Sequence, residues 1–240
     1  KTTITSIISL ILKKYFKLSV FIISIDDFYK TRNERLSLSK KVHPFLMTRG
    51  VPGTHDIKIM LDFFKKAKSN NFRLLKLPKF NKAIDDRYNK KLWHSIKKKP
   101  DIIIFEGWCV GARAEKNNSL KKAINSLERN NDKKLIWRKF VNQQLKLKYK
   151  KLYTQLDCML FLKANNFRLL QQWRLKQEKK LWLKNKRSRN NKIMNKKDVI
   201  KFMQTYQRIT QNMLKHAPKY SSMILNLNRN HQIKSVKYKL

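Results

Sequence analysis

Carboxylates stand at the ends of two apolar segments of this chain. Asp26 and Asp27 follow the segment 19–25, and Glu106 follows the segment 102–105. Short, β-branched runs of this kind are typical of parallel strands that are covered on both faces. Acids just past the carboxyl edge of such strands lie where open α/β sheets bind ligands, so one can take a proton from a hydroxyl while another holds Mg²⁺. A helix N-cap is the alternative for either aspartate.

A second candidate is the helical pattern that opens with Lys1, Thr2 and Thr3. These residues have the form of the second half of a phosphate-binding loop, G-x-x-x-x-G-K-[ST]. In the complete motif, backbone N–H groups at the helix start cradle the phosphates, the lysine contacts their oxygens and the hydroxyl binds Mg²⁺. Three residues alone also fit an ordinary helix start.

The elements that must position these residues are indicated by the spacing of apolar side chains. Apolar residues recur at three- and four-residue steps along 3–16, which predicts an amphipathic helix. Four short apolar runs predict strands at 19–25, 102–105, 158–162 and 223–227. Long helical stretches separate them, so we expect an α/β fold with a doubly wound parallel sheet. Without repeats or a Gly- or Pro-rich linker, residues 1–240 are expected to form a single domain.

The charge of the chain raises a different possibility. Lys and Arg number 58 against 15 Asp and Glu, a net charge of +43, which suggests nucleic-acid binding. The basic residues are mostly lysines spread along the whole chain, however, which favours compositional drift toward A/T-rich codons, so we do not expect a nucleic-acid partner. With 41% apolar residues the chain is too hydrophobic for a disordered basic tail.

The cysteines and the lengths of the apolar runs indicate in which cellular compartment the protein is expected. Cys109 and Cys158 have no metal-ligand spacing around them, so we expect two buried thiols in a reducing compartment. No apolar run is long enough to span a membrane, and the opening segment lacks a signal-peptide cleavage site. We therefore expect a cytoplasmic protein.

Together these residues resemble those of a known family. It resembles the plant- and bacterial-type D-glycerate 3-kinases, which belong to the uridine kinase- and phosphoribulokinase-like P-loop kinases. The likeness runs nearly end to end. The matching segments are S-I-D-D-F-Y (24–29), V-H-P-F-L-M-T-R-G-V-P-G-T-H-D (42–56), L-P-K-F-N-K-A-I-D-D-R (77–87), F-E-G-W-C-V-G-A (105–112) and Q-Q-W-R-L-K-Q-E (171–178).

The resemblance implies a role for each of these candidates. Lys1 and Thr2, with Thr3 beside them, would bind the phosphates of ATP; Asp26 would be the general base. Thr2 and Glu106 would hold Mg²⁺. The acceptor pocket would be lined by Asp27, Tyr29, Arg49, Thr54, His55, Asp56, Lys79, Lys82 and Arg87. Its cations suit an anionic acceptor such as glycerate, although each also fits a solvated surface residue.

The resemblance also implies a lid around residues 168–197. Arg174, at its base, would neutralise charge on the transferring phosphoryl group, and Arg168 and His231 would contact the nucleotide. From the residues alone, the charged stretch 175–197 fits a mobile lid or a solvated helix equally well.

Two departures from the family pattern affect these expectations. Asn81 stands where the family's F-D-K motif has Asp, which puts the function of that carboxylate in doubt. The Gly-rich loop and the strand before it are absent from the sequence, and in this fold class that strand is central. Loss of this strand leaves backbone groups of its neighbours unpaired, at a cost of about 1 to 3 kcal/mol for each group. We therefore expect the 240-residue chain alone to fold poorly and to be inactive, and the natural protein to extend upstream.

The expected function is therefore ATP- and Mg²⁺-dependent transfer of a γ-phosphoryl group to D-glycerate, giving 3-phosphoglycerate. The nearest alternative is a related kinase with another acceptor, such as pantothenate or uridine. The alternative from another class is a basic nucleic-acid-binding protein without catalysis. The oligomeric state is not indicated by any pattern in the sequence.

Overall fold

The computed structural model describes residues 1–184 and 194–239, which form two compact units. The first comprises Lys1–Val110 and Ile136–Leu156, and the second comprises Gly111–Leu135 and Asp157–Leu240. The expected lid falls in the second unit, and its residues 185–193 lie outside the described part of the chain.

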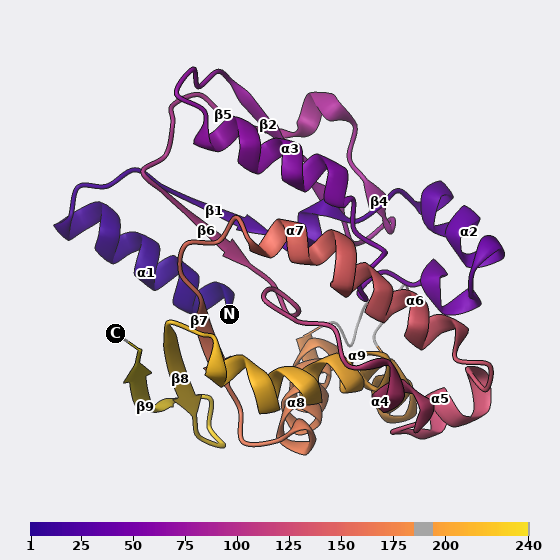
Figure 1. Cartoon of the computed structure of the whole chain (residues 1–240). Coiled ribbons are helices and arrows are strands. Elements are labelled where there is room, and N and C mark those ends of the chain that lie inside the picture. Colours follow the sequence, from indigo (N-terminus) through magenta and orange to yellow (C-terminus); the bar gives the residue numbers. More distant parts are fainter. Residues whose placement is uncertain (185–193, 240) are drawn as a thin grey trace. The chain divides into compact units, whose positions relative to one another are not determined.

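The first unit contains a helix and two parallel strands, and the helix lies at its edge (Figure 1). Helix α1 (Thr2–Tyr15) packs along strands β1 (Val20–Ser24) and β6 (Ile102–Glu106). The two strands pair in parallel from Val20 with Ile102 to Ser24 with Glu106. The predicted helix and both strands are confirmed, although Ile7 and Phe16 of the predicted apolar helix face are 51% and 65% exposed.

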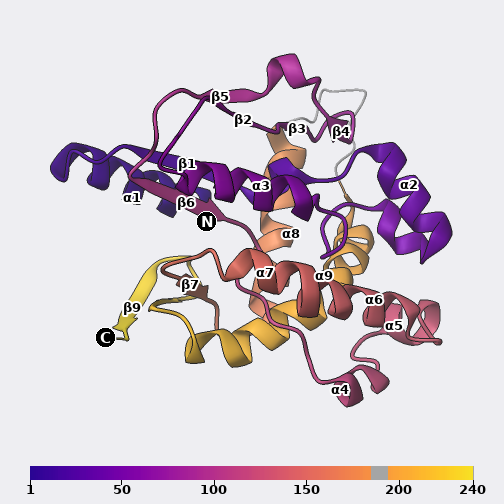
Figure 2. The same cartoon turned by 45° about the horizontal axis from the view of Figure 1, so that its top comes forward.

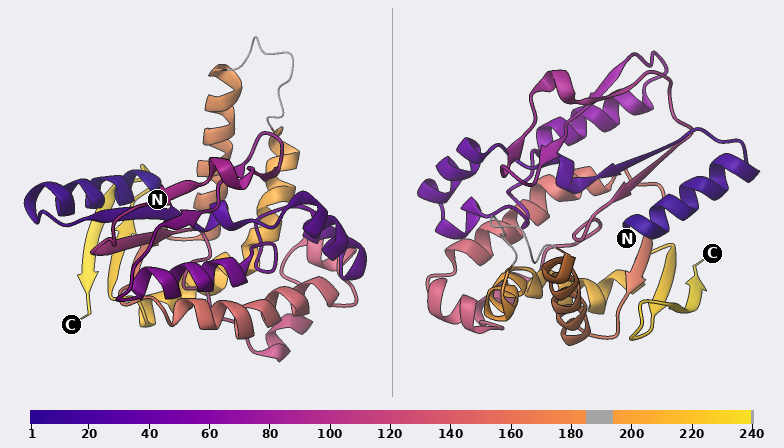
Figure 3. Two further views of the ribbon diagram at one scale, coloured as in Figure 1. Left: turned by 90° about the horizontal axis from the view of Figure 1, so that it is seen from above. Right: turned by 180° about the vertical axis from the view of Figure 1, so that it is seen from behind.

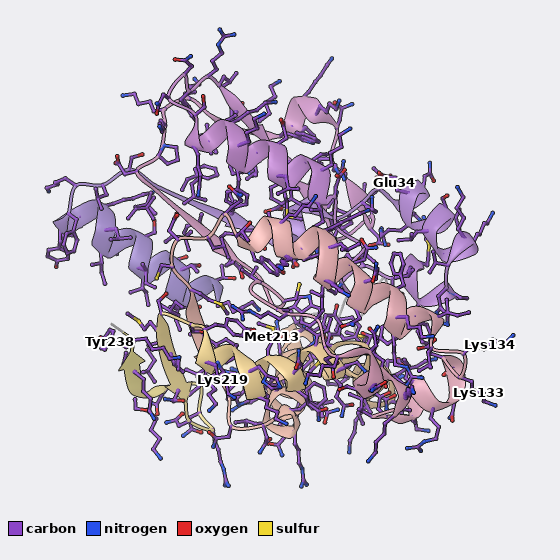
Figure 4. The ribbon with its side chains drawn as sticks, in the orientation of Figure 1. Glu34, Lys133, Lys134, Met213, Lys219 and Tyr238 are labelled. Atoms are coloured by element: carbon purple, nitrogen blue, oxygen red, sulfur yellow. The ribbon has the colours of Figure 1, made fainter. Side chains whose placement is uncertain are left out.

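Short helices follow β1 and carry the chain to helix α3. They are η1 (Ile25–Phe28), α2 (Arg32–Lys41), η2 (Pro44–Met47) and α3 (Ile57–Lys68). Helix α2 begins with a capping box, in which Thr31 and Glu34 each accept a hydrogen bond from the other's backbone N–H (Glu34 is labelled in Figure 4). Asp56 is the N-cap of helix α3, and its carboxylate accepts a hydrogen bond from the N–H of Ile59. The helix buries Met60, Phe63 and Phe64.

Two small antiparallel ladders, which the apolar pattern did not predict, complete the first unit (Figure 2). Strand β2 (Leu75–Leu77) pairs with β5 (His94–Ile96), and β3 (Phe80–Asn81) pairs with β4 (Asp86–Arg87). A short turn of helix, η3 (Lys90–Leu92), precedes β5. The other segment of the unit is a continuous helical stretch made of α6 (Ile136–Gln144), the π-helical turn η4 (Leu145–Tyr149) and α7 (Lys150–Tyr153).

The second unit combines a three-stranded sheet with a pair of long helices. Helices α8 (Phe167–Lys184) and α9 (Lys196–His216) lie side by side, as both views in Figure 3 show. Strand β7 (Leu160–Lys163) pairs in parallel with β8 (Met223–Leu227), and β9 (Ile233–Tyr238) is antiparallel to β8. The smaller helices are α4 (Asn117–Lys121), α5 (Ser126–Asn131) and η5 (Ala217–Lys219).

The predicted α/β class with parallel strands is confirmed, with additions. All four predicted strands form, as β1, β6, β7 and β8. Among the described residues, β1–β6 and β7–β8–β9 are separate ladders, and the antiparallel pairs are extra to the doubly wound pattern.

Three surface and burial features bear on the other expectations. Cys109 is buried as predicted, but the prediction of a buried Cys158 is wrong, because that thiol is exposed just before β7. Within the described ranges no helix is long and apolar enough to cross a membrane. Lysine side chains project from both units, as Lys133 and Lys134 do in Figure 4, so the positive charge is spread over the surface.

Candidate active site

The carboxyl edge of β1 and β6 in the first unit brings two predicted site residues, Thr2 and Glu106, together. Ser24 and Glu106 are paired neighbours at the ends of these strands. The hydroxyl of Thr2, in the first turn of α1, lies 3.5 Å from a carboxylate oxygen of Glu106. The start of the helix thus meets the acid that ends the neighbouring strand. Lys1 is the N-cap residue of α1, and among residues 1–184 and 194–239 no side-chain hydrogen bond caps the first turn of this helix.

Asp26 lies two residues beyond the end of β1, in η1. Its backbone N–H donates to the Ser24 hydroxyl at 3.3 Å, so Ser24 is the N-cap and the alternative of a capping aspartate does not apply. The Asp26 carboxylate accepts hydrogen bonds from the hydroxyl of Tyr29 at 3.0 Å and from Lys82 Nζ at 2.8 Å. The carboxylate is therefore held from both sides in one orientation.

A glycine permits this close packing at the strand edge. Gly107 follows β6, and a Cβ on it would collide with the side chain of Ile25, the residue before Asp26. Because only glycine fits there, the end of β6 can pass directly beside the turn that carries the candidate base.

The two aspartates have pKa values that shift in opposite directions. Burial would raise the pKa of Asp26, but hydrogen bonds from Lys82 and Tyr29 and the Lys82 charge outweigh it, and the pKa is lowered. The pKa of Asp27 is raised, mainly by burial and further by the charge of Asp26. Asp26 is therefore the more acidic member of the pair. Neighbouring carboxylates with diverging pKa values are a common sign of an acid–base site.

The loop of residues 49–56 runs beside Tyr29 and is tied to it through the backbone. The N–H of Lys30 donates to the carbonyl of Thr54 at 2.9 Å, and the N–H of Asp56 donates to that of Phe28 at 2.7 Å. The buried Thr54 hydroxyl donates to Val51 O and accepts from the N–H of Gly50, so it stabilises the loop's own turn.

His55 is almost completely enclosed, at 1% exposed, like its neighbour Thr54 in the predicted pocket. Its ring stacks on that of Tyr29, with centroids 4.5 Å apart, and its Nδ1 lies 2.6 Å from the hydroxyl of Tyr149. Burial lowers the pKa of His55 to about 3, against an opposing effect of the Asp26 charge. His55 is therefore neutral at physiological pH.

The four predicted pocket cations differ in the groups that they contact. Lys82 contacts Asp26 directly, and Arg87 donates to the carbonyl of Tyr29 at 2.9 Å and to the Asp56 carboxylate at 3.4 Å. Arg49 is paired with the carboxylate of Asp85. Lys79 lies over the ring of Tyr88, 5.1 Å from its centroid.

Sequence reasoning missed Asp85, which pairs with both Arg49 and the fully buried Arg35. It adopts a left-handed backbone conformation, with φ of 58°. A non-glycine residue in that region is uncommon, and no periodic pattern marks it.

The remaining predicted residues belong to the second unit. Arg174 is paired with Glu178, donates to Gln177 at 3.1 Å and lies over the ring of Phe202. His231 meets the ring of Trp173 edge to face, at 3.7 Å between centroids. Arg168 is exposed on α8.

The donor set at Thr2 and Glu106 fits magnesium better than a softer metal. It offers one hydroxyl and one carboxylate oxygen 3.5 Å apart. Mg²⁺ commonly takes only one or two protein oxygens and completes its shell with water and substrate phosphates. Across the described residues no group of three or more His, Cys, Asp and Glu side chains could hold a metal alone.

Comparison with known proteins gives this geometry its context. No family model matches the chain. The kinase mug58 of Schizosaccharomyces pombe is 29% identical over 196 residues, which are 78% of this chain and 68% of that protein. The chloroplastic D-glycerate 3-kinase of Arabidopsis thaliana is 27% identical over 187 residues, which are 74% of this chain and 38% of that protein. The chain thus spans well under half of the plant relative.

Solved structures show the same fold. The D-glycerate 3-kinase of Cryptococcus neoformans matches 99% of this chain and 86% of its own, with a TM-score of 0.81 at 24% identity. A phosphoribulokinase from Rhodobacter spheroides matches the whole chain with a TM-score of 0.55 at 9% identity. The chain has the α/β fold of the P-loop kinases, and the resemblance to D-glycerate 3-kinases found in the sequence is confirmed.

Proposed function

We propose that this protein is an ATP-dependent kinase that transfers the γ-phosphoryl group to a hydroxyl of D-glycerate and so forms 3-phosphoglycerate. The observation that carries the proposal is the meeting of the α1 start with the acid that ends β6, where Thr2 lies 3.5 Å from Glu106. Strand β1 pairs with β6 up to Ser24 and leads into the turn that carries Asp26. The homologues named as kinases, including a D-glycerate 3-kinase, support it.

In this mechanism Asp26 receives the proton of the acceptor hydroxyl. Tyr29 and Lys82 each hydrogen-bond one of its carboxylate oxygens and fix its orientation. Its lowered pKa keeps it ionised, so it is ready to accept a proton at neutral pH. Phosphoryl transfer depends mainly on such positioning and on charge stabilisation.

The nucleotide would bind at the start of α1. Lys1, Thr2 and Thr3 would contact its phosphates through side chains and backbone N–H groups, and Thr2 and Glu106 would hold the metal. When bound, Mg²⁺ neutralises charge on the phosphate oxygens. In the second unit, Arg168, Arg174 and His231 are proposed as further contacts to the nucleotide or the transferring group.

The acceptor would lie beside Asp26, between the loop of residues 49–56 and the cations near it. Its carboxylate requires a paired positive charge once water is excluded, which Lys82 and Arg87 can supply. Asp27, Tyr29, Arg49, Thr54, His55, Asp56 and Lys79 complete the proposed pocket.

Turnover with a panel of acceptors tests the proposal. ADP formation by the full-length natural protein is measured with ATP, Mg²⁺ and either D-glycerate, pantothenate or uridine. We expect D-glycerate to give the highest kcat/KM, because only a small acid matches the paired cations. Preference for pantothenate or uridine would keep the kinase and change its acceptor, and no turnover with any acceptor would contradict the kinase proposal.

The net charge of +43 supports a second candidate function, nucleic-acid binding. If it were the function, affinity for RNA or DNA would be high and would fall steeply from low to physiological salt, because phosphate contacts release counterions. We expect only weak binding without sequence preference, since the lysines are spread over both units.

A further inference from the structure

Tyr149, which the sequence pattern did not single out, lies under the loop of residues 49–56. It is fully buried and ends η4, a π-helical turn. Its hydroxyl lies 3.1 Å from the backbone nitrogen of Gly53 and 2.6 Å from Nδ1 of His55. Single π-turns within helices frequently mark functional sites.

The hydrogen bonds around this hydroxyl decide which nitrogen of His55 carries the proton. A phenolic oxygen has one proton to donate and two lone pairs to accept with. One lone pair accepts from the backbone N–H of Gly53, and among the described residues Nδ1 of His55 is the only acceptor recorded within hydrogen-bond distance of the hydroxyl. The hydroxyl proton therefore goes to Nδ1, and the proton of the neutral imidazole must be on Nε2.

Nε2 of His55 has no hydrogen-bond partner among the described residues, although it is buried. An unpaired buried donor costs about 1 to 3 kcal/mol, so such a group is retained where it serves a ligand. The ring that carries it stacks on Tyr29, whose hydroxyl donates to Asp26. The free donor is thus one aromatic ring away from the proposed base.

We propose that Tyr149 is a positioning residue of the acceptor pocket: it fixes His55 as the Nε2–H tautomer, so that Nε2–H donates to an oxygen of the anionic acceptor. This proposal rests on the proposed function. It assigns to His55 the part of a neutral hydrogen-bond donor that selects an acceptor oxygen, while the cations pair with the acceptor's charge.

The tautomer can be observed directly by ¹⁵N NMR of protein labelled in its histidine rings. The wild type is expected to show one tautomer of His55 at neutral pH, with the proton on Nε2, and addition of D-glycerate is expected to shift the Nε2 resonance more than that of Nδ1. Two results with the wild-type protein alone would overturn the proposal. One is a proton on Nδ1, and the other is an Nε2 resonance that does not move on addition of any acceptor that the enzyme phosphorylates.

The variant Tyr149→Phe removes only the hydroxyl. We expect it to give a mixture of His55 tautomers and to raise the KM for the acceptor about tenfold, with the Kd for ATP unchanged. Tyr153→Phe is the matched control, because Tyr153 lies one turn further along and donates to the carbonyl of Cys109 at 2.5 Å. It should keep one tautomer and the wild-type KM.

These measurements separate the two proposals. An unchanged tautomer in Tyr149→Phe contradicts the positioning role even if the enzyme phosphorylates D-glycerate. Absence of turnover in the wild type with every acceptor contradicts the proposed function, while a tautomer that depends on Tyr149 would still establish the coupling of Tyr149 to His55.

Discussion

Lys82 Nζ lies 2.8 Å from the carboxylate of Asp26, and this pair joins the β3–β4 region to the turn after β1. The lysine side chain is 62% exposed and that of Asp26 is 31% exposed, so the ion pair contributes little to stability. Its effect is instead on the protonation of Asp26, whose second oxygen is held by Tyr29. The pair therefore bears on catalysis more than on folding.

Replacing Asp26 by Asn tests its role as the base. The amide cannot take a proton, so we expect kcat to fall by roughly 10² to 10⁴, the usual contribution of a general base. Affinity for ATP, measured by calorimetry, should stay nearly unchanged. Asp62→Asn, an exposed acid paired with Lys66 on α3, is the control and should leave kcat at the wild-type value. Unchanged turnover in Asp26→Asn would remove Asp26 from this role.

Removing the Lys82 charge should move the pH dependence of kcat. Burial alone would raise the pKa of Asp26, and Lys82 is the main group that lowers it. In Lys82→Met the base becomes protonated at higher pH, so the acidic limb of the kcat profile shifts upward. Lys66→Met, which removes an exposed charge on α3, should leave the limb in place. A limb that stays in place in both variants would exclude this electrostatic coupling.

His55 should make the first unit sensitive to acid. Its folded pKa is about 3, whereas an exposed histidine titrates near 6.5, so only the unfolded state gains a proton between these values. Stability is full above pH 6.5 and falls with pH by up to ~1.36 kcal/mol per unit. Between pH 7 and 5 we expect a loss of about 2 kcal/mol by urea denaturation that His55→Gln lacks. An equal pH slope in both proteins would contradict the buried neutral state.

Much of the fold was predictable, because a buried strand or helix leaves a periodic apolar pattern. Helix α1 and strands β1, β6, β7 and β8 each left one. Strands β2 to β5 are only two or three residues long, and every residue of β9 is exposed. Such strands form because their backbones pair with a neighbouring strand, and this pairing leaves no apolar pattern in the sequence around them.

Likewise, only some residues of the candidate site were predictable from the sequence. Asp26 and Glu106 were found because each directly follows an apolar run. Tyr149 was not, since a tyrosine in an amphipathic helix looks like any core residue until its partners Gly53 and His55 are seen. Asp85 likewise acquires its role only through the arginines that fold onto it.

Gly53 should be intolerant of any side chain. Its φ of 104° is a conformation that other residues rarely adopt, and a Cβ there would lie 2.5 Å from Phe140. We expect Gly53→Ala to lower the free energy of unfolding by about 1 to 3 kcal/mol in urea denaturation. Adding Phe140→Leu should recover only part of this, because it relieves the clash and leaves the backbone strain. A neutral Gly53→Ala would show that the loop can adopt another conformation.

Arg208 should be the most sensitive charged residue of the second unit. Its guanidinium donates two hydrogen bonds of 2.7 Å to Glu128, which is fully buried, and further ones to the carbonyls of Ser119 and Lys122. Arg208→Met leaves the Glu128 charge buried without its arginine, which typically costs about 3 to 5 kcal/mol. The double variant with Glu128→Leu should recover much of that loss, because an apolar pair can replace a buried ion pair at little cost. The free energies of unfolding of both variants are measured by urea denaturation. A double variant no more stable than Arg208→Met would show that the carbonyl contacts, not the Glu128 pair, hold α9 to α5.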